Sequence, residues 1–197
     1  NPSYADAYSN LGAVYKEAKE YEKAYGYYEQ AVKLNPKHTN ANFDMALIEL
    51  SRGEYESAWP KYEHRLKMNE LLSKTYKYKT PMWRGEALEG KTIILQNEQG
   101  YGDNIMFIRY VPKFLDMGAK VIIRTRPELV KLFESIEGVA LVCSEEEKGI
   151  PEHDYYLPIM SSALMFKTTL KTIPSNFPYL RSLGKNSDIG LDNQKTN

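Results

Sequence analysis

The chain has 197 residues, 42% hydrophobic and 26% charged, and its 26 lysines and arginines balance its 26 aspartates and glutamates. This composition is ordinary for a soluble globular protein of one large or two small domains, and it excludes a bulk attraction to nucleic acid or anionic membranes. No apolar run approaches the roughly 20 residues that a membrane-spanning helix needs. A single cysteine, Cys143, excludes an internal disulfide and gives no metal-site spacing. We therefore expect a cytoplasmic protein without a bound metal.

The first part of the chain contains two copies of one pattern. Around Gly12 it reads AYSNLGAVYKEAKEYEKAYGYYEQAVKLNP, and one period later it reads NFDMALIELSRGEYESAWPKYEHRL. Small residues at Gly12 and Ala24 would let paired helices approach, and Tyr28 would fill the gap to the next helix. This pattern, with a period of about 34 residues, resembles the tetratricopeptide repeat. It predicts helices at about residues 5–18, 21–34, 39–52 and 55–68.

From Pro81 onward the repeat period is lost. Short apolar runs (TIIL, AKVIIRT, VALVC) alternate with the amphipathic segments NIMFIRYVPKFLDMG and PELVKLFESIEG. A further strand is expected at His153–Leu157, followed by a helical segment near Ser161–Lys171. Strands separated by helices predict βαβ units and a parallel sheet. The predicted fold class is therefore α + α/β, with helical repeats followed by a Rossmann-like parallel α/β half-domain.

Changes in composition predict the domain limits. Asn1-Pro2 lies one repeat period before Asn35-Pro36, the pair that closes the first repeat, so we expect a piece of a longer repeat array. Trp83 is the expected anchor of the connector. The predicted divisions are repeats at 1–72, a connector at 73–91, an α/β half-domain at 92–183 and a polar tail at 184–197.

The segment QNEQGYGDNIMF, residues 96–107, follows the first predicted strand and leads into a helix. Ligands of parallel α/β sheets bind at such loops, where glycines let the backbone approach and helix N-termini attract anions. Alternatively, Asp103 is only the N-cap of the helix and the glycines only serve the turn. The spacing lacks the full dinucleotide fingerprint, and no lysine follows as in a P-loop. A simple nucleotide cradle is therefore disfavoured.

Three strings in this half carry a family resemblance: EQGYGDNIMFIRYVP, GAKVIIRTRPELVKLFESIEGV and HDYYLPIMSSALMFKTTLKTIPSNFPYL. Together with the repeats, they resemble a bacterial family in which tetratricopeptide repeats precede a glycosyltransferase-like domain. That domain is similar to heptosyltransferases and, more distantly, to O-linked N-acetylglucosamine transferases. The resemblance implies a GT-B architecture, in which two Rossmann-like halves face each other and the N-terminal half holds the acceptor.

The resemblance also implies roles for individual residues. Asp103 would be the catalytic general base near the acceptor hydroxyl. The backbone of Gly100, Tyr101, Gly102 and Asn104 would shape the substrate site. Ser161 lies where another strand-end loop would face the cleft, or it only caps a helix. No second Rossmann-like half follows residue 181, so we expect no cofactor in this chain and no transfer without a donor half that binds the nucleotide-sugar.

The repeats suggest a partner surface of their own. Asn10 and Asp44 occupy equivalent positions of the two repeats and fall on the helix that lines the groove of such arrays. In the transferase relatives, asparagines at this position form a ladder that binds a peptide backbone, and Asp44 breaks that ladder here. Alternatively, the α/β domain or the connector covers the apolar inner face of the second repeat, which carries Phe43, Leu47 and Leu50.

Two hypotheses follow. In the first, the repeats bind a protein or peptide, and the α/β part is the acceptor-side half of a nucleotide-sugar glycosyltransferase with a glycan or protein acceptor. In the second, the α/β part is non-catalytic and the whole chain is an interaction scaffold. Neither hypothesis involves nucleic acid or a membrane span.

Overall fold

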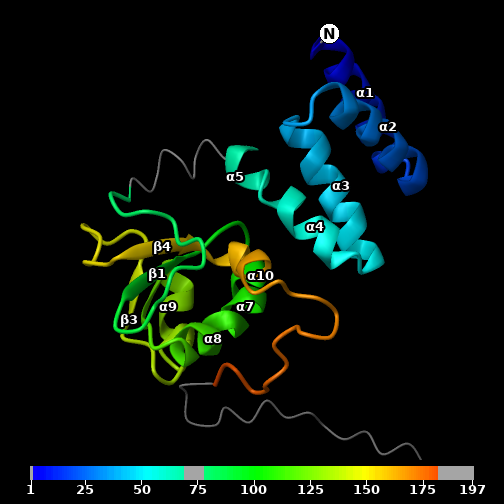
Figure 1. The fold of residues 1–197 in the computed structure, drawn as a ribbon. Coiled ribbons are helices and arrows are strands. Elements are labelled where there is room, and N and C mark those ends of the chain that lie inside the picture. Colours follow the sequence, from blue (N-terminus) through cyan, green and yellow to red (C-terminus); the bar gives the residue numbers. More distant parts are fainter. Residues whose placement is uncertain (1, 69–77, 182–197) are drawn as a thin grey trace, which may run out of the picture.

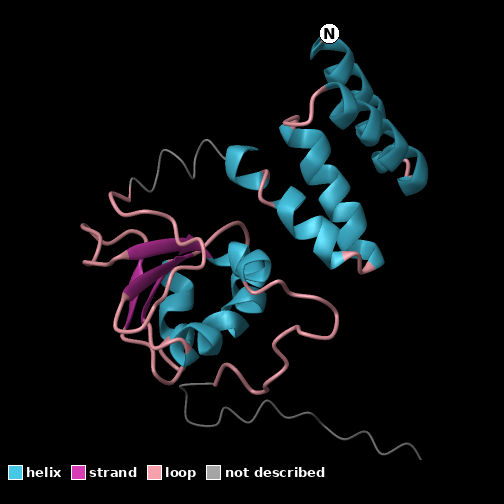
Figure 2. Ribbon diagram, in the orientation of Figure 1, coloured by secondary structure: helices cyan, strands magenta, loops and turns pink. Residues whose placement is uncertain are grey.

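The computed structural model describes residues 2–68 and 78–181 and has a helical part followed by an α/β part (Figures 1 and 2). The helical part consists of α1 (Pro2–Glu17), α2 (Tyr21–Leu34), α3 (Thr39–Arg52), α4 (Tyr55–Tyr62) and α5 (Arg65–Met68). The first three predicted helices are confirmed. The fourth is broken after Tyr62, just beyond Pro60, which has no N–H to donate. There the His64 N–H bonds to the Lys61 carbonyl at 3.0 Å, three residues back.

Small residues at the predicted positions let the repeat helices pack closely. A methyl group at Gly12 would lie 2.5 Å from the Tyr28 ring, so only glycine admits that ring against α1. Tyr28 is fully buried, as the sequence predicts. The core of the helical part is formed by Ala24, Tyr28, Ala31, Ala41, Met45 and Ile48.

The α/β part is a four-stranded parallel sheet of order β3-β2-β1-β4, which confirms the predicted fold class. The strands are β1 (Thr92–Gln96), β2 (Lys120–Thr125), β3 (Leu141–Ser144) and β4 (Tyr155–Pro158). The helical segments are α7 (Tyr101–Phe107), η1 (Ile108–Tyr110), α8 (Val111–Asp116), α9 (Pro127–Phe133), η2 (Ile159–Ser161) and α10 (Ser162–Met165). Because β2 and β4 flank β1 on opposite sides, the loops after β1 and β4 diverge at a topological switch point.

Two predicted helices are shorter than expected. The segment after β1 is divided into α7, η1 and α8, because Pro112 cannot donate the hydrogen bond that a continuous helix needs. The helical segment expected to reach Lys171 ends at Met165. Lys167 adopts a φ of 47°, in the left-handed region that ends helices.

Trp83 anchors the start of the α/β part, as predicted. Its side chain is buried, its backbone N–H donates to the Tyr156 carbonyl at 2.9 Å, and its ring meets Phe114 edge-on at 5.4 Å. The first connector residues, 73–77, and the predicted tail, 184–197, lie outside the described residues. The domain limits therefore stay predictions.

One hydrophobic core joins the helical part to the α/β part. Trp59 of α4 contacts the Phe107 ring of α7 edge-on at 6.3 Å, and its indole N–H donates to the Thr168 carbonyl at 2.8 Å. In Figure 1, α4 lies on the side of the helical part that faces α7 and α10. The two parts are thus packed against each other through large apolar side chains.

Candidate functional site

The loop between β1 and α7 turns at Gln99, which adopts a φ of 50°. The glycines do not make this turn, since Gly100 has a φ of −84° and Gly102 lies within α7. The interpretation that the glycines serve the tight turn is therefore wrong. A methyl group at Gly102 would meet nothing within 4 Å, so the space beside it is open.

Asn104 holds the loop in shape. Its side-chain amide donates to the carbonyls of Glu98 (2.6 Å) and Gly100 (2.7 Å), and its oxygen accepts from the Glu98 N–H at 3.1 Å. The side chain is fully buried. Its hydrogen-bonding groups are engaged within the loop, and direct substrate binding by Asn104 stays a prediction.

Arg126, after β2, supports the outer edge of the same loop. Its guanidinium donates to the Gln99 carbonyl at 2.7 Å and lies 4.9 Å from the centroid of the Tyr101 ring. Tyr101 is exposed at the rim of the loop. A substrate role for Tyr101, Gly100 or Gly102 stays a prediction.

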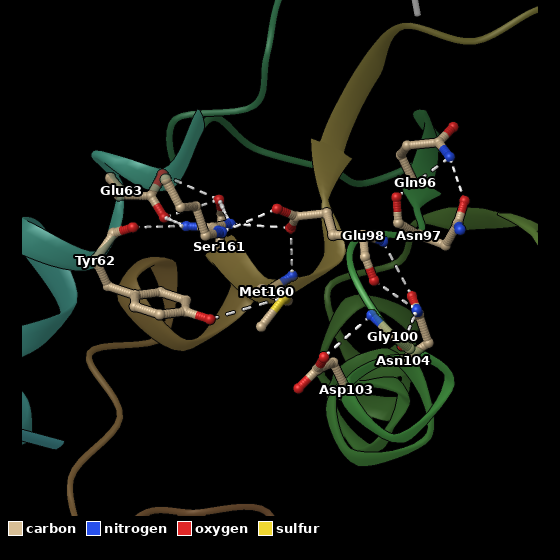
Figure 3. A network of polar contacts seen from close by, with 11 residues as sticks. Tyr62, Glu63, Gln96, Asn97, Glu98, Gly100, Asp103, Asn104, Met160 and Ser161 are labelled. Carbon is tan, nitrogen blue, oxygen red and sulfur yellow. Dashed lines mark hydrogen bonds and ion pairs between the residues drawn. The ribbon is translucent and has the colours of Figure 1, made fainter. Parts of the chain in front are cut away.

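A buried polar network, here called the Arg65 network, joins α5 to the loops after β1 and β4 (Figure 3). Arg65 makes two hydrogen bonds of 2.9 Å to the Glu98 carboxylate and one of 2.8 Å to Ser161 Oγ. Ser161 Oγ donates to Glu63 at 2.9 Å, and the Met160 N–H donates to Glu98 at 2.9 Å. Arg65 also donates to Glu63 at 2.5 Å.

Every charged group of the Arg65 network has a charged partner within it. Burial alone would lower the pKa of Arg65, but the Glu98 and Glu63 carboxylates raise it above its ordinary value. Each group is held by several partners, the condition under which a buried ion pair offsets its desolvation. The network occupies the switch point between the loops after β1 and β4.

Ser161 acts within this network and not as a helix cap. It directly precedes α10, but its side chain makes no capping bond there, so the capping interpretation is wrong. Its hydroxyl is fully buried between Arg65 and Glu63. Substrate binding by Ser161 stays a prediction.

Sequence reasoning missed Arg65 and Glu98. Their pairing joins residues 33 positions apart, and the repeat pattern that contains Arg65 gives no indication of a partner in the α/β part. The available signal was a glutamate placed directly after a buried strand, where an unpaired carboxylate would be costly.

Asp103 stands at the third position of α7. One of its carboxylate oxygens accepts the Gly100 N–H at 3.1 Å, whereas Gly100 itself is the N-cap. The interpretation of Asp103 as the N-cap residue is therefore wrong, although its bond does tie the helix start to the loop. Of the residues that the structure describes, only Gly100 donates to this carboxylate, so its other oxygen has no hydrogen-bond partner among them.

Asp103 also faces a cavity of about 260 Å³ between the helical part and the α/β part, here called the Asp103 cavity. Burial raises the pKa of Tyr62, on the opposite wall, to about 12, so that phenol stays neutral at physiological pH. The walls consist of Leu47, Leu50, Tyr55, Trp59, Tyr62, Asp103, Met106, Phe107, Arg109, Tyr110, Met160, Thr168 and Ile173.

The predicted partner residues of the repeats lie apart from this cavity wall. Asn10 is exposed on α1, and Asp44 is paired with Lys16 at 2.7 Å. Partner binding by Asn10 and Asp44 stays a prediction. Leu47 and Leu50 line the Asp103 cavity together with residues of α7, so the inner face of the second repeat is turned towards the α/β part. Leu47 is nevertheless 39% exposed, and the covering of this face stays a prediction.

Residues 2–68 and 78–181 contain neither a membrane span nor a metal cluster. No helix among them combines the length and apolar character needed to cross a membrane. No group of three or more histidine, cysteine, aspartate or glutamate side chains in these ranges could hold a metal ion.

Comparison with known proteins finds a similarity in the first part of the chain. The model of the tetratricopeptide repeat matches residues 5–38, which correspond to α1, α2 and the turn before α3. No curated protein matches the chain. The matched segment confirms the first repeat, and such repeats are typical of modules that bind other proteins.

Proposed function

We propose that the chain joins a protein-interaction repeat to the acceptor-side half of a nucleotide-sugar glycosyltransferase, with Asp103 as general base. The observation that supports this proposal best is the unpartnered carboxylate oxygen of Asp103 on the wall of the cavity. General-base catalysis needs a carboxylate that a substrate hydroxyl can reach. The strand order and the position of Asp103 after β1 agree with ligand binding at the carboxyl edge of the sheet.

In this proposal the surrounding residues have separate tasks. Gly100, Tyr101 and Gly102 border the acceptor on the exposed side of the loop, while Asn104 keeps the loop in position. The nucleotide-sugar would bind a second Rossmann-like half facing this one.

The experiment uses the full-length product of the natural gene, with a panel of nucleotide-sugars and release of the nucleotide as the readout. Asp103→Asn should lower turnover at least about 100-fold, the lower range for loss of a general base. Asp116→Asn, on the exposed end of α8, is the matched control and should leave turnover unchanged. Wild-type turnover in Asp103→Asn would refute the proposed role.

An interaction scaffold is the second candidate function. The Arg65 network favours it, because protein side chains fill the switch point where ligands of such sheets bind. A scaffold would neither bind nor turn over nucleotide-sugars at full length. Sugar transfer by the full-length protein would exclude it.

A further inference from the structure

The loop after β1 is open to solvent on the side that faces away from the protein interior, and an arginine borders it there. Residues 99–102 are exposed, and a methyl group at Gly102 would meet nothing within 4 Å. Arg126, directly after β2, reaches this surface by donating from its guanidinium to the Gln99 carbonyl at 2.7 Å. Loops at the carboxyl ends of neighbouring parallel strands form the ligand sites of such sheets. A ligand on the exposed side of this loop would therefore lie beside a positive charge.

The charge of Arg126 is not neutralised within the described part of the chain. No carboxylate there forms an ion pair with it, and its Nε–H is shielded from water without a hydrogen-bond acceptor. Glu128, the nearest carboxylate along the sequence, is exposed. Arg65, in contrast, is paired with two carboxylates. Because partly buried charges in proteins are normally paired, an anion from outside the chain would supply the missing partner of Arg126.

One peptide group connects Arg126 to Asp103. Arg126 donates to the carbonyl oxygen of this group, that of Gln99, and Asp103 accepts its N–H, that of Gly100, at 3.1 Å (Figure 3). With ordinary C=O and C–N lengths, the two hydrogen bonds hold the guanidinium nitrogen and the carboxylate oxygen within about 8.4 Å of each other. A ligand of the size of one monosaccharide can therefore reach both groups.

The groups around this peptide suit different parts of one ligand. Asp103 has an oxygen without a partner among the described residues, and such an oxygen can accept the proton of a hydroxyl group. The planar N–H fork of Arg126 matches the oxygens of a phosphate or a carboxylate. The Tyr101 ring is 43% exposed, and its centroid lies 4.9 Å from the guanidinium carbon. This ring holds the guanidinium in place and offers an apolar surface to the C–H groups of a sugar.

We propose that Arg126 binds an anionic group, a phosphate or a carboxylate, on an acceptor sugar whose hydroxyl lies at Asp103. This inference rests on the proposed function and deepens it, because it assigns the acceptor to the anionic saccharides. Arg126 is a binding residue and takes no part in the proton transfer. The neutral counterpart of such a sugar would keep its contact with Asp103 and lose the charge-assisted hydrogen bonds to Arg126.

The test titrates the isotope-labelled chain with glucose 6-phosphate, glucuronate and neutral glucose. In NMR spectra the backbone amide signals of Tyr101 and Gly102 report on the exposed side of the loop, and the Nε–H signal of Arg126 reports on the guanidinium. At least one of the two anionic sugars should bind about 10-fold or more tightly than glucose, the lower range for hydrogen bonds to a charged group. Inorganic phosphate alone should bind more weakly than glucose 6-phosphate.

Variants locate the charge that is recognised. Arg126→Gln keeps an amide that can donate to the Gln99 carbonyl and removes the charge, so the preference for the anionic sugar should fall below about twofold. Lys131→Gln removes the same charge from an exposed position of α9 and is the matched control that should retain the preference. Gly102→Leu fills the open space beside the loop and keeps Arg126, so it should weaken the binding of all three sugars. This variant tests the site even if Arg126→Gln fails to fold.

Several results would overturn the inference: no binding, equal binding of glucose and both anionic sugars, or an undiminished preference in Arg126→Gln. Undiminished binding in Gly102→Leu would place the ligand elsewhere. If inorganic phosphate binds as tightly as glucose 6-phosphate, the loop holds a free anion and the assignment to a sugar is refuted. Tighter binding of a capped phosphoserine peptide would refute the saccharide in favour of a phosphorylated protein.

These titrations need no sugar donor, so the two proposals can fail separately. Failure of sugar transfer at full length would refute the proposed function and leave the measured preference for the anionic sugar unchanged. Sugar transfer with equal binding of charged and neutral sugars would refute only the role of Arg126.

Discussion

Two carboxylates near the carboxyl end of β1, Glu98 and Asp103, are close in sequence and differ in burial and in hydrogen bonding. Glu98 is buried, pairs with Arg65 and accepts the Met160 N–H. Asp103 lines the cavity and accepts one N–H from Gly100, and its second oxygen has no hydrogen-bond partner among the described residues. Figure 3 shows Glu98 reaching towards Ser161, while Asp103 stays beside Gly100 at the start of α7. A carboxylate whose oxygens are all hydrogen-bonded to the protein stabilises the fold, whereas one with an unpartnered oxygen can accept a hydrogen bond from a ligand.

The largest expected effect comes from removing the ion-pair partner of Glu98, the carboxylate whose oxygens are all hydrogen-bonded. Arg65→Met leaves Glu98 buried without its guanidinium and should lower the free energy of unfolding by about 3–5 kcal/mol. Urea denaturation followed by circular dichroism measures it. The double variant with Glu98→Met should lose clearly less than the sum of the two single variants, since neither charge then remains unpaired. Strict additivity would show that the two residues are not coupled.

A smaller loss is expected from the loop that separates the two carboxylates. Asn104→Ala leaves the N–H and carbonyl of Glu98 without their partner and should cost about 1–3 kcal/mol. The control is Asn10→Ala, on an exposed surface, which should stay within about 0.5 kcal/mol of the parent. Equal unfolding free energies for the two variants would contradict the role of Asn104 in the loop.

Substitution of Asp103, the carboxylate with an unpartnered oxygen, should change the free energy of unfolding little. Asp103→Asn keeps an oxygen for the Gly100 N–H and removes only the favourable charge near the helix start, so it should cost at most about 1 kcal/mol. A loss of several kcal/mol in urea denaturation would show instead that Asp103, like Glu98, is needed to hold the fold together.

The smallest expected effect is an increase in stability. Gly102→Ala should raise the free energy of unfolding by about 0.5–1 kcal/mol, because alanine is a better helix former and nothing lies within 4 Å of its methyl group. Differential scanning calorimetry would detect the rise. If sugar transfer by the full-length protein falls at the same time, the open space beside Gly102 is used by a ligand. A destabilised variant would show that this space is occupied in the folded protein.

The helices and strands could be predicted because they follow from local patterns. The repeat period placed α2 and α3 at their observed limits, and the β-branched runs placed the strands. Gly12 and Ala24 were predictable as positions of close packing from the repeat pattern, whereas the contact of the Tyr28 ring with Gly12 is seen only in the folded structure.

The site was only partly predictable. The position of Asp103 after a buried strand follows from local sequence, but its free oxygen depends on which donors the fold supplies. Arg65 and Glu98 meet only because α4 stops at Tyr62 and the helical part packs on the switch point. The left-handed turn at Gln99, beside two glycines, also contradicts the usual preference.

Urea unfolding of Glu98→Gln and Asp103→Asn, measured side by side, tests the central contrast most directly. Both substitutions remove one negative charge and nearly preserve side-chain size. The account predicts that Glu98→Gln loses at least about 2 kcal/mol more than Asp103→Asn, because it leaves the buried Arg65 undercompensated. Equal losses of unfolding free energy in the two variants would contradict the distinction between the buried, fully paired Glu98 and the partly unpaired Asp103.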